Sequence, residues 1–410
     1  MGGVSMEWKE VRLGDVCSEL SDGLHKAPKF IVNGEYIFVN AKNLYNGYIL
    51  DNDSTKKTSH EEYLKYKKPL GKHSILYSID GTIGNIAKYR GEKCVLGKGA
   101  CYINCNPEIV ESSYLYYQLQ SPHFKSYIHL MSTGSTIKHI SLKTMRDYVF
   151  ELPSLEDQRH IASILSSLDR KIELNNKINA DLEEMAQAIF KNWFVDFEPF
   201  KDGKFVDSEL GMIPEGWKVG RLDEIADVVG GSTPSKAKPE YYTQKGIAWL
   251  TPKDLSNHPA VYTSRGEIDI TEEGYNSTST KLMPKGTILF TSRAPIGYIS
   301  IAQNDICTNQ GFKSLVPKKA GTCFLYCFLK YVTPEIENKS TGSTFKEASG
   351  ALMKSLQVIM PEQKVFEDFE EIVCPLFARI ESLEKENSRL SLLRDTLLPR
   401  LMSGELEVPE

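Results

Sequence analysis

The chain repeats itself, because the same short motifs occur in the same order in both halves. Ser-Thr-Gly-Ser-Thr occurs at 132–136 and again at 340–344, and a proline follows each copy, at Pro153 and Pro361. Three more pairs of segments match at similar offsets: Trp8-Lys9 with Trp217-Lys218, Tyr36–Leu44 with Ile247–Leu255, and Ser74–Ser78 with Thr287–Thr291. Order and spacing are kept over half of the chain, which predicts two domains of one fold.

Each half has an irregular block followed by a helical block. Short runs rich in Ile, Val, Tyr and Phe, broken by Gly, Pro, Asn and Asp, predict strands, for example at 74–79 and 287–290. Residues 156–190 contain neither Gly nor Pro. Their apolar residues recur at helical spacing: Ile161, Leu165, Leu168, Ile172, Ile178, Leu182, Met185 and Ile189.

A second helical stripe follows the second block. Its apolar residues are Phe369, Val373, Leu376, Ile380, Leu383, Leu390, Leu393 and Leu397. Pro375 interrupts the stripe, and we expect it to kink the helix or to split off its first turns. Asn387 in this stripe, and Asn175 and Asn176 in the first, are polar breaks that resemble register-setting residues.

A near-heptad stripe predicts a partner helix, and the other copy is the natural one. The residues expected at this helix–helix or partner interface are Leu165, Leu168, Ile172, Leu182, Leu376, Ile380, Leu383 and Leu390. Ordinary domain core is the alternative explanation of the stripes. A helix of about 35 residues is about 52 Å long, enough to hold two blocks apart.

The predicted fold class is therefore α+β, with two β-rich domains related by the repeat and joined by two long antiparallel, coiled-coil-like helices. The predicted boundaries are 1–152 for the first domain, 153–196 for the first helix, 197–361 for the second domain, and 362–410 for the second helix and tail.

The net charge of −5 hides an asymmetry along the chain. Residues 1–150 carry 19 Lys and Arg against 15 Asp and Glu, and residues 197–361 carry 19 against 18. The helical blocks are acidic, with 5 against 9 in 151–196 and 6 against 12 in 362–410. A polyanion is therefore expected against the two β-rich blocks rather than the helices.

Catalytic motifs are missing from the sequence. It holds no P-loop, no H-E-x-x-H, no G-x-S-x-G and no Asn-Pro-Pro-aromatic run. Cys101 with Cys105 and Cys323 with Cys327 lie four apart, but no matching His or Cys pair accompanies them, so buried thiols are favoured over a zinc site. We therefore expect a binding protein without catalytic or metal-ligating residues.

Localisation is predicted from three features. Eight Cys without a C-x-x-C favour a reduced compartment. No apolar run approaches the roughly 18 residues of a membrane span, and residues 1–6 lack the layout of a signal peptide. We expect a cytoplasmic protein.

The repeated loop combines small hydroxyls, a flexible Gly and a nearby Lys, which suits close approach to a sugar-phosphate backbone. The predicted DNA contacts in it are Ser135, Thr136, Lys138, Ser343, Thr344 and Lys346. A structural turn shared by both copies explains the motif equally well.

Three further residues are candidate DNA contacts. Arg293 is a candidate base reader because Arg pairs bidentately with guanine, and its counterpart in the first copy is Asp80. Lys253 and Gln310 are polar groups at expected strand-to-loop transitions. Taken singly, each of these two is more typical of a solvated surface residue.

Five stretches resemble the specificity subunit of a type I restriction-modification system, and the likeness covers nearly the whole chain. They are Leu152–Arg159 (LPSLEDQR), Asn192–Phe197 (NWFVDF), Ser208–Trp217 (SELGMIPEGW), Cys307–Phe312 (CTNQGF) and Leu392–Gly404 (LLRDTLLPRLMSG). The second helix start, Met360–Lys364, departs from the first by being shorter.

The resemblance implies two target-recognition domains, each reading half of a split, asymmetric double-stranded DNA sequence, with the helices as spacers. It also implies two methyltransferase subunits that dock on the spacers and methylate adenine N6, and motor-nuclease restriction subunits. S-adenosylmethionine, ATP and magnesium are then expected on these partners and none on this chain. A membrane partner is not expected.

Two other classes of protein compete with this reading. A nuclease fused to a recognition domain needs a carboxylate–metal constellation or a nucleotide motif, and the sequence shows neither. A structural coiled-coil adaptor without DNA readout does not require two large β-rich blocks with different loop chemistry.

Overall fold

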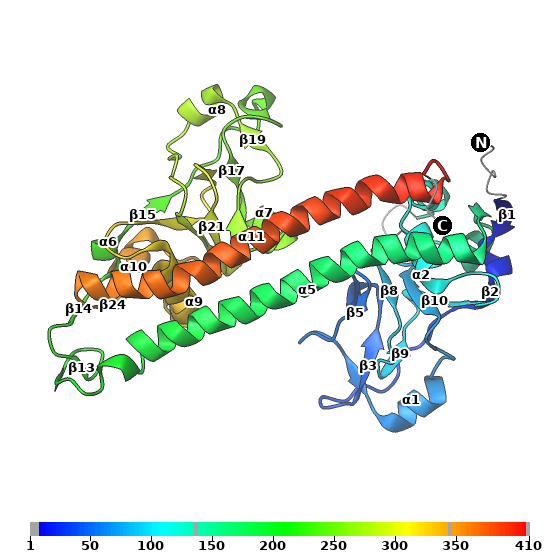
Figure 1. Cartoon of the computed structure of the whole chain (residues 1–410), viewed down its shortest axis with the longest axis horizontal. Helices are drawn as coiled ribbons and strands as arrows, with labels where there is room; N and C mark the ends of the chain where they lie inside the picture. Colours follow the sequence, from blue (N-terminus) through cyan, green and yellow to red (C-terminus); the bar gives the residue numbers. More distant parts are fainter. Residues whose placement is uncertain (1–7, 135–137, 343–345, 407–410) are drawn as a thin grey trace. The chain divides into compact units, whose positions relative to one another are not determined.

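The computed structural model describes residues 8–134, 138–342 and 346–406 (Figure 1). The chain forms two compact units. Unit 1 comprises Met1–Ile172 and Arg389–Glu410, and unit 2 comprises Glu173–Ser388. Each unit therefore takes one copy of the repeat together with segments from both long helical stretches.

Unit 1 is built from short strands with four short helices. Its helices are α1 (His60–Tyr66), α2 (Ser112–Gln118), α3 (Pro122–Met131) and α4 (Leu142–Arg146), and the 3-10 turns are η1 (Leu13–Val16) and η2 (Ala41–Asn43). Its strands are β1 (Lys9–Arg12), β2 (Cys17–Asp22), β3 (Tyr36–Val39), β4 (Leu44–Tyr45), β5 (Tyr48–Ile49), β6 (Lys57–Thr58), β7 (Ser74–Ser78), β8 (Ile86–Lys88), β9 (Cys94–Leu96), β10 (Ala100–Cys105) and β11 (Val149–Leu152).

Unit 2 repeats this plan. Its helices are α6 (Leu222–Ile225), α7 (Pro252–Asn257), α8 (Glu272–Asn276), α9 (Thr322–Lys339) and α10 (Gly350–Ser355), and its 3-10 turns are η3 (Glu198–Phe200) and η4 (Pro239–Tyr241). Its strands are β12 (Phe205–Val206), β13 (Ile213–Pro214), β14 (Lys218–Arg221), β15 (Ala226–Gly230), β16 (Tyr242–Thr243), β17 (Trp249–Leu250), β18 (Tyr262–Thr263), β19 (Asp269–Ile270), β20 (Ile288–Ser292), β21 (Ile296–Ala302), β22 (Cys307–Thr308), β23 (Lys313–Pro317) and β24 (Gln357–Met360).

The main sheets of the two units share four strands in the same order, and unit 2 adds β18 at the edge. The main sheet has the order β2-β10-β7-β8 in unit 1 and β15-β23-β20-β21-β18 in unit 2. A second, parallel pairing joins β3 to β9 and, equivalently, β17 to β22. An antiparallel ribbon closes each domain, β1 with β11 and β14 with β24. The predicted α+β repeat is confirmed.

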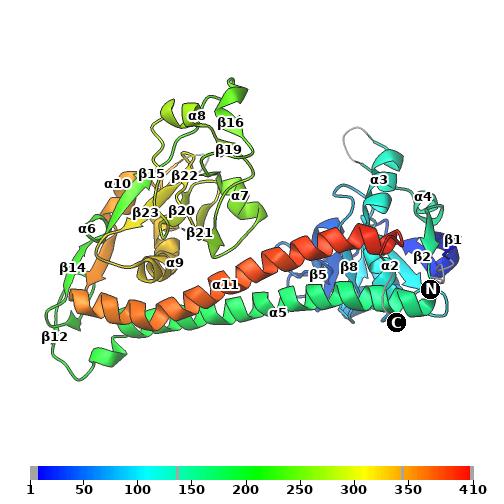
Figure 2. The ribbon, with the colours of Figure 1, turned by 45° about the horizontal axis from the view of Figure 1, so that its top comes forward.

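Two helices of 40 residues follow the two domains: α5 (Leu155–Phe194) and α11 (Gln363–Met402). Within unit 1 the first turns of α5 run antiparallel beside the last turns of α11. Within unit 2 the last turns of α5 run beside the first turns of α11, as both views show (Figure 1 and Figure 2). The sequence predicts both long helices correctly, because their apolar stripes are long and regular.

Pro375 lies inside α11, which runs without interruption from Gln363. The expectation that Pro375 splits off the first turns is therefore wrong. Proline removes one backbone N–H and leaves the carbonyl of Glu371, four residues earlier, without its helical partner. Both residues are exposed, so water can satisfy that carbonyl.

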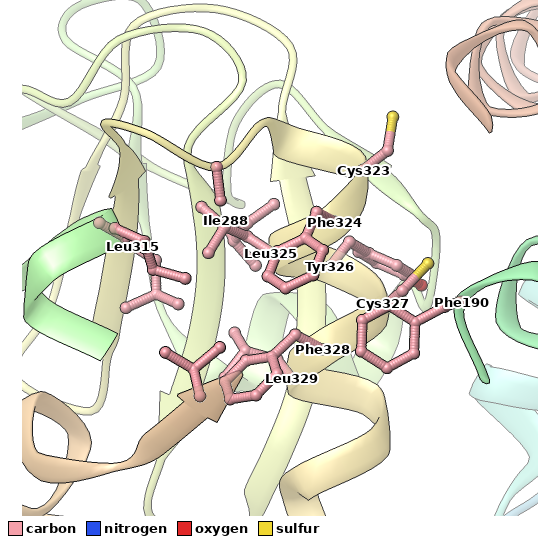
Figure 3. Packing of buried hydrophobic residues seen from close by; sticks show 14 of the residues in the cluster. Phe190, Ile288, Leu315, Cys323, Phe324, Leu325, Tyr326, Cys327, Phe328 and Leu329 are labelled. Atoms are coloured by element: carbon pink, nitrogen blue, oxygen red, sulfur yellow. The ribbon is translucent and has the colours of Figure 1, made fainter. Parts of the chain in front are cut away.

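The core of unit 2 packs α9 between the sheet and the long helices. Figure 3 shows the side chains of α9 between Ile288 and Leu315 of the sheet and Phe190 of α5. The ring of Phe324 lies 5.5 Å from that of Phe190 and 4.9 Å from that of Phe194, centroid to centroid. The repeated domain and the long helices of unit 2 therefore share one apolar core.

Unit 1 has the same arrangement. Tyr77, Phe124 and Tyr148 are fully buried, with edge-to-face ring contacts that join the sheet to α3. Leu165 of α5 and Leu401 of α11 belong to the same cluster. Among the described residues, no helix is both long and apolar enough to span a membrane.

Candidate nucleic-acid interface

A cavity of about 920 Å³ opens on unit 2. Lys253, in the first turn of α7, and Arg293, directly after β20, both line it. Asn309 and Gly311, which flank Gln310, line it as well. The structure therefore brings two predicted DNA-contacting residues, Lys253 and Arg293, to one concave surface that Trp249 also lines, while Gln310 lies between two lining residues without lining the cavity itself.

Arg293 is held by an ion pair. Its Nη1 lies 3.5 Å from Oε2 of Glu347, and the Nζ of Lys313 lies 3.4 Å from Oε1 of the same carboxylate. The side chain of Arg293 is 37% exposed. Ala294, the next residue, has a φ of 52°, which a residue with a Cβ adopts only when its surroundings impose it. One carboxylate thus orients the guanidinium and leaves most of its donors for another acceptor.

Gln310 is exposed on a loop that is pinned to the sheet. Its Oε1 accepts a hydrogen bond from the hydroxyl of Thr233. Gly231 makes the close approach of this loop possible, because a Cβ at that position would lie 2.2 Å from the carbonyl oxygens of Thr308 and Asn309. The amide nitrogen of Gln310 remains a hydrogen-bond donor.

Lys253 lies in the first turn of α7, whose start is capped. The carboxylate of Asp254 accepts the N–H and the hydroxyl of Thr251, each at 2.7 Å. The Nζ of Lys253 lies 3.7 Å from Oε2 of Glu267, and both side chains are about three-quarters exposed, at 73% and 76%. Water screens such a pair, so Lys253 can exchange Glu267 for a phosphate at little cost.

The two Ser-Thr-Gly-Ser-Thr loops start from equivalent bridges. Thr133 pairs with His139 in unit 1, and Thr341 pairs with Glu347 in unit 2. The predicted contacts Ser135, Thr136, Ser343 and Thr344 lie outside the described residues. They stay predictions.

The lysines of these loops are placed at their bases. Lys138 and Lys346 are both exposed. The Nζ of Lys346 donates to the carbonyl of Glu337 at 3.1 Å, while the carbonyl of Lys138 accepts the N–H of Gly81 at 3.0 Å. Both lysines stand one residue before the paired position at the loop base.

A polar side-chain pair joins each loop base to the sheet. In unit 1 the carboxylate of Asp80 contacts Nδ1 of His139, and in unit 2 Arg293 contacts Glu347. The register is the same, because Ile140 N donates to Ile79 O and Ala348 N to Ser292 O, each at 2.9 Å. The acid lies on the strand side in unit 1 and on the loop side in unit 2.

Lys98 is a candidate contact that the sequence reasoning missed. In unit 1, Leu24 N donates to Leu96 O, and in unit 2, Ser232 N donates to Thr308 O. This register makes Lys98 the equivalent of Gln310, and Lys98 is exposed. The signal in the sequence is Gly97-Lys98-Gly99 against Asn309-Gln310-Gly311, both directly after the parallel-paired strand.

Lys42 is a second missed candidate, and it is the equivalent of Lys253 in the repeat. It is exposed, and its Nζ donates to the carbonyl of Ser54 at 3.4 Å. The repeat itself contains this signal, because Lys42-Asn43-Leu44 matches Lys253-Asp254-Leu255. Transferring Lys253 from one copy to the other would have found Lys42, whereas the equivalence of Lys98 and Gln310 needs the sheet register.

The predicted helix-interface residues vary in burial. Leu165, Ile380 and Leu383 are fully buried, and the others are half-buried, namely Leu168, Ile172, Leu182, Leu376 and Leu390. Two residues of the apolar stripes, Met185 at 52% and Leu393 at 46% exposure, face solvent instead. Solvent-facing apolar groups on these helices leave room for a further contact.

An asparagine layer crosses the helix pair within unit 2. The Nδ2 of Asn175 donates to Oδ1 of Asn387 and to Oε2 of Glu386, each at 2.9 Å. The Nδ2 of Asn387 donates to Oδ1 of Asn176 at 2.8 Å. A sliding of one helix would break these bonds and leave the buried amide nitrogen of Asn175 without a partner, so the layer sets the register of α5 against α11 within unit 2.

Comparison with known proteins gives the family. Residues 6–184 and 214–390 match the family described as type I restriction modification DNA specificity domain. The MjaIX specificity subunit of a type I restriction enzyme from Methanocaldococcus jannaschii is 40% identical over 190 residues, which are 46% of this chain and 44% of that protein. The HindI specificity subunit from Haemophilus influenzae is 25% identical over an alignment that covers 98% of this chain and all of that protein.

The fold is similar to a solved one. The crystal structure of the type I restriction-modification S subunit from M. genitalium has a TM-score of 0.58 and 19% identity, and the match covers 98% of this chain and 97% of that one. These matches favour DNA recognition over a structural adaptor. The chain therefore belongs to the type I restriction-modification DNA specificity family, and within it is a specificity subunit, the non-catalytic component whose two repeated domains recognise the DNA target.

Proposed function

We propose that each repeated domain reads one half of a split, asymmetric DNA target, and that α5 and α11 set the gap between the halves. One observation carries this proposal. The two domains share one fold, yet the acid of the polar pair at the loop base changes sides, because Asp80 contacts His139 in unit 1 whereas Arg293 contacts Glu347 in unit 2. Equal folds that present different donors and acceptors at equivalent places suit two different half-sites.

The cavity of unit 2 supports a reading role for Arg293. A guanidinium beside a carboxylate is already oriented, so little side-chain freedom remains to be lost when it binds a base. Lys253 lines the same cavity, and Lys253, Gln310 and Lys346 are all exposed, which suits phosphate or base-edge contacts. In unit 1, Lys42, Lys98 and Lys138 take the corresponding places.

The partners follow from family membership. We propose that two methyltransferase subunits dock on the long helices, and that restriction subunits join the complex to cleave unmodified DNA. S-adenosylmethionine, ATP and magnesium then belong to those partners. The acidic charge of 151–196 and 362–410 supports a protein rather than a DNA partner for the helices.

Methylome sequencing tests the proposal. The chain is expressed with its methyltransferase subunits in a host without DNA methylation, and N6-methyladenine is mapped across the genome. We expect one split, asymmetric motif. A continuous palindromic motif, or a soluble complex that adds no methylation, contradicts the proposal.

Variants assign the halves of the motif. Arg293→Ala is expected to relax one position in one half only, since a bidentate arginine contributes about 1–3 kcal/mol of discrimination. The matched control is Arg221→Ala, which removes an arginine of the same unit that pairs with Asp223 at 2.9 Å and does not line the cavity. Relaxation in both halves, or none, argues against Arg293 as a reader.

Charge reversal tests the two loops. Lys138→Glu and Lys346→Glu are expected to weaken DNA binding without changing the motif, because phosphate contacts carry no sequence information. Each variant should also reduce the slope of log affinity against log salt by about 1. An unchanged slope with unchanged affinity assigns the lysines to ordinary surface.

A further inference from the structure

Two cysteines and a glutamate converge in unit 2. Cys323 lies in the first turn of α9, and Glu370 and Cys374 lie one turn apart on α11. The sulfur of Cys323 is 3.2 Å from that of Cys374, and the sulfur of Cys374 is 3.2 Å from Oε2 of Glu370. The three ligand atoms all lie within 4.8 Å of one another. Cys327, one turn further along α9 in Figure 3, is not part of this cluster.

The carboxylate of Glu370 is held in place before any ion arrives. Its Oε1 accepts the N–H of Phe324 at 2.8 Å, and its Oε2 accepts the N–H of Cys323 at 3.3 Å. Gly321 makes room for it, because a Cβ at that position would lie 2.1 Å from Cδ of Glu370. The free N–H groups at the start of α9 thus fix the orientation of one prospective ligand.

The cluster is buried on one side and open on the other. Cys323 is 3% exposed, Glu370 is half-buried and Cys374 is exposed. An ion can therefore enter from the side of Cys374, and water can complete its coordination. Tetrahedral coordination at about 2.3 Å needs sulfurs about 3.8 Å apart, which a small rotation of the exposed Cys374 side chain supplies.

The donor set selects the kind of ion. Thiolates are soft ligands that favour Zn²⁺ and related ions, while Mg²⁺ and Ca²⁺ require oxygen ligands. We propose that Cys323, Glu370 and Cys374 form a binding site for one thiophilic divalent cation of the Zn²⁺ class, with water as the fourth ligand. Binding releases the two thiol protons to solvent and cross-links α9 to α11.

Unit 1 provides an internal contrast. There Oε1 of Gln158 accepts the N–H of Glu111 at the start of α2, at 2.8 Å, and the residue one turn later on α5 is Ala162 rather than a cysteine. Among the described residues, the Cys323 cluster is the one group of three Cys, His, Asp or Glu side chains with this geometry. The proposed ion therefore belongs to unit 2 alone.

Metal titration of the full-length chain tests the site. The reduced protein is stripped with a chelator and titrated with Zn²⁺ against a chromophoric competitor, and with Co²⁺, whose thiolate charge-transfer absorption identifies sulfur ligands. We expect one equivalent and a sulfur signature. A chain with all eight thiols reduced that binds no Zn²⁺ overturns the proposal. A chain in which thiol titration finds two thiols fewer, because Cys323 and Cys374 are oxidised to a disulfide, overturns it as well.

Variants distinguish the site from adventitious binding. Cys374→Ser removes an exposed ligand and is expected to weaken the affinity for Zn²⁺ by more than about 100-fold. This exceeds the loss expected when a residue that only supports a ligand is removed. Gly321→Ala changes no ligand atom, yet it displaces Glu370 and is expected to weaken affinity about 10-fold. Cys327→Ser is the matched control on the same helix. Equal Zn²⁺ affinity in Cys374→Ser and Cys327→Ser contradicts the site.

Discussion

In unit 1, helix α2 begins against α5, where the neutral amide of Gln158 accepts the N–H of Glu111. In unit 2, helix α9 begins against α11, where the carboxylate of Glu370 accepts the N–H groups of Cys323 and Phe324. The first N–H groups of a helix always need an acceptor. The fold therefore requires an acceptor at this place in both copies, while its charge is free to differ.

Each unit also joins a tyrosine to a carboxylate of α5. Tyr117 donates to Asp169 at 2.6 Å, and Tyr326 donates to Glu183 at 2.8 Å. Burial, together with the neighbouring carboxylate, raises the pKa of both tyrosine hydroxyls, so they stay protonated donors at neutral pH. A cation completes each site. In unit 1 the Nη1 of Arg394 lies 2.8 Å from Oδ1 of Asp169, and in unit 2 the Nζ of Lys330 lies 2.7 Å from Oε1 of Glu183.

The largest expected loss of stability comes from replacing either of two equivalent glycines, Gly23 and Gly231. A Cβ on Gly23 would lie 2.3 Å from two backbone carbonyl oxygens, and a Cβ on Gly231 would lie 2.2 Å from two. Backbone cannot move aside as a side chain can, so Gly23→Ala and Gly231→Ala should each lower the free energy of unfolding by about 3 kcal/mol. Urea unfolding measures this.

The control for this pair is Gly230→Ala. Gly230 precedes Gly231 and has open space at its Cβ position, so the change should be close to neutral. A large loss of unfolding free energy for only one of the two glycine variants would show that the two positions are not equivalent.

The tyrosines should give a smaller, matched effect. Tyr117→Phe and Tyr326→Phe each remove a hydrogen bond to a charged group, which contributes about 1.5–3 kcal/mol. Tyr331→Phe on α9 is the control, because Tyr331 is 49% exposed and contacts Phe190 through its ring. Thermal unfolding compares the three, and a loss confined to one unit would show that the two sites are not energetically alike.

The stability of the chain should depend on pH through one buried carboxyl group of unit 2. Glu384 of α11 accepts the N–H groups of Val261 and Tyr262 at 2.8 and 3.0 Å. Burial raises its pKa to about 7, and the nearby Glu183 and Glu381 add to this, while the two hydrogen bonds oppose it.

The sign follows from proton uptake. Between pH 4.5 and 7 the folded chain holds a proton on Glu384 that the unfolded chain has released, so stability falls as pH rises through this window. We expect a loss of about 1–3 kcal/mol. Urea midpoints from pH 4.5 to 8 measure it, and Glu384→Gln should flatten the slope. An unchanged slope in that variant would assign the dependence to other groups.

The smallest effect is expected at the rim of the cavity. Glu267→Gln removes the exposed partner of Lys253, and such pairs contribute less than about 1 kcal/mol, so the unfolding midpoint should hardly move. DNA affinity should rise slightly, because Lys253 no longer has to leave a carboxylate. Fluorescence anisotropy with the assembled complex measures this, and a fall in affinity would show that Glu267 positions Lys253 for DNA.

Sequence predicts the repeat and the long helices well, because both depend on local patterns that extend over many residues. The sheet register is not local, and this is why Lys98 was missed as the equivalent of Gln310. The same reason hid the approach of Cys374 to Cys323, which are 51 residues apart in sequence. Only the helix-on-helix packing of α9 and α11 brings them together.

One difference between the copies has no simple sequence signal. Helix α2 ends at Gln118 and α3 begins at Pro122, and the Ser121 hydroxyl caps α3 by accepting the N–H of Phe124 at 3.1 Å. The matching Thr333 and Pro334 lie inside α9, where the Thr333 hydroxyl donates to a carbonyl one turn earlier. A hydroxyl before proline is compatible with both outcomes, so packing decides between a break and a continuous helix.

The antiparallel ribbons that close the two domains have a consequence for inheritance. Lys9 pairs with Leu152, and Lys218 pairs with Met360, so the first and last residues of each domain are neighbours. A cassette whose two ends meet can be replaced by another of the same plan without disturbing the chain on either side. Recombination at these ribbons would therefore give descendants new target sequences in a single step, while the helices are passed on unchanged.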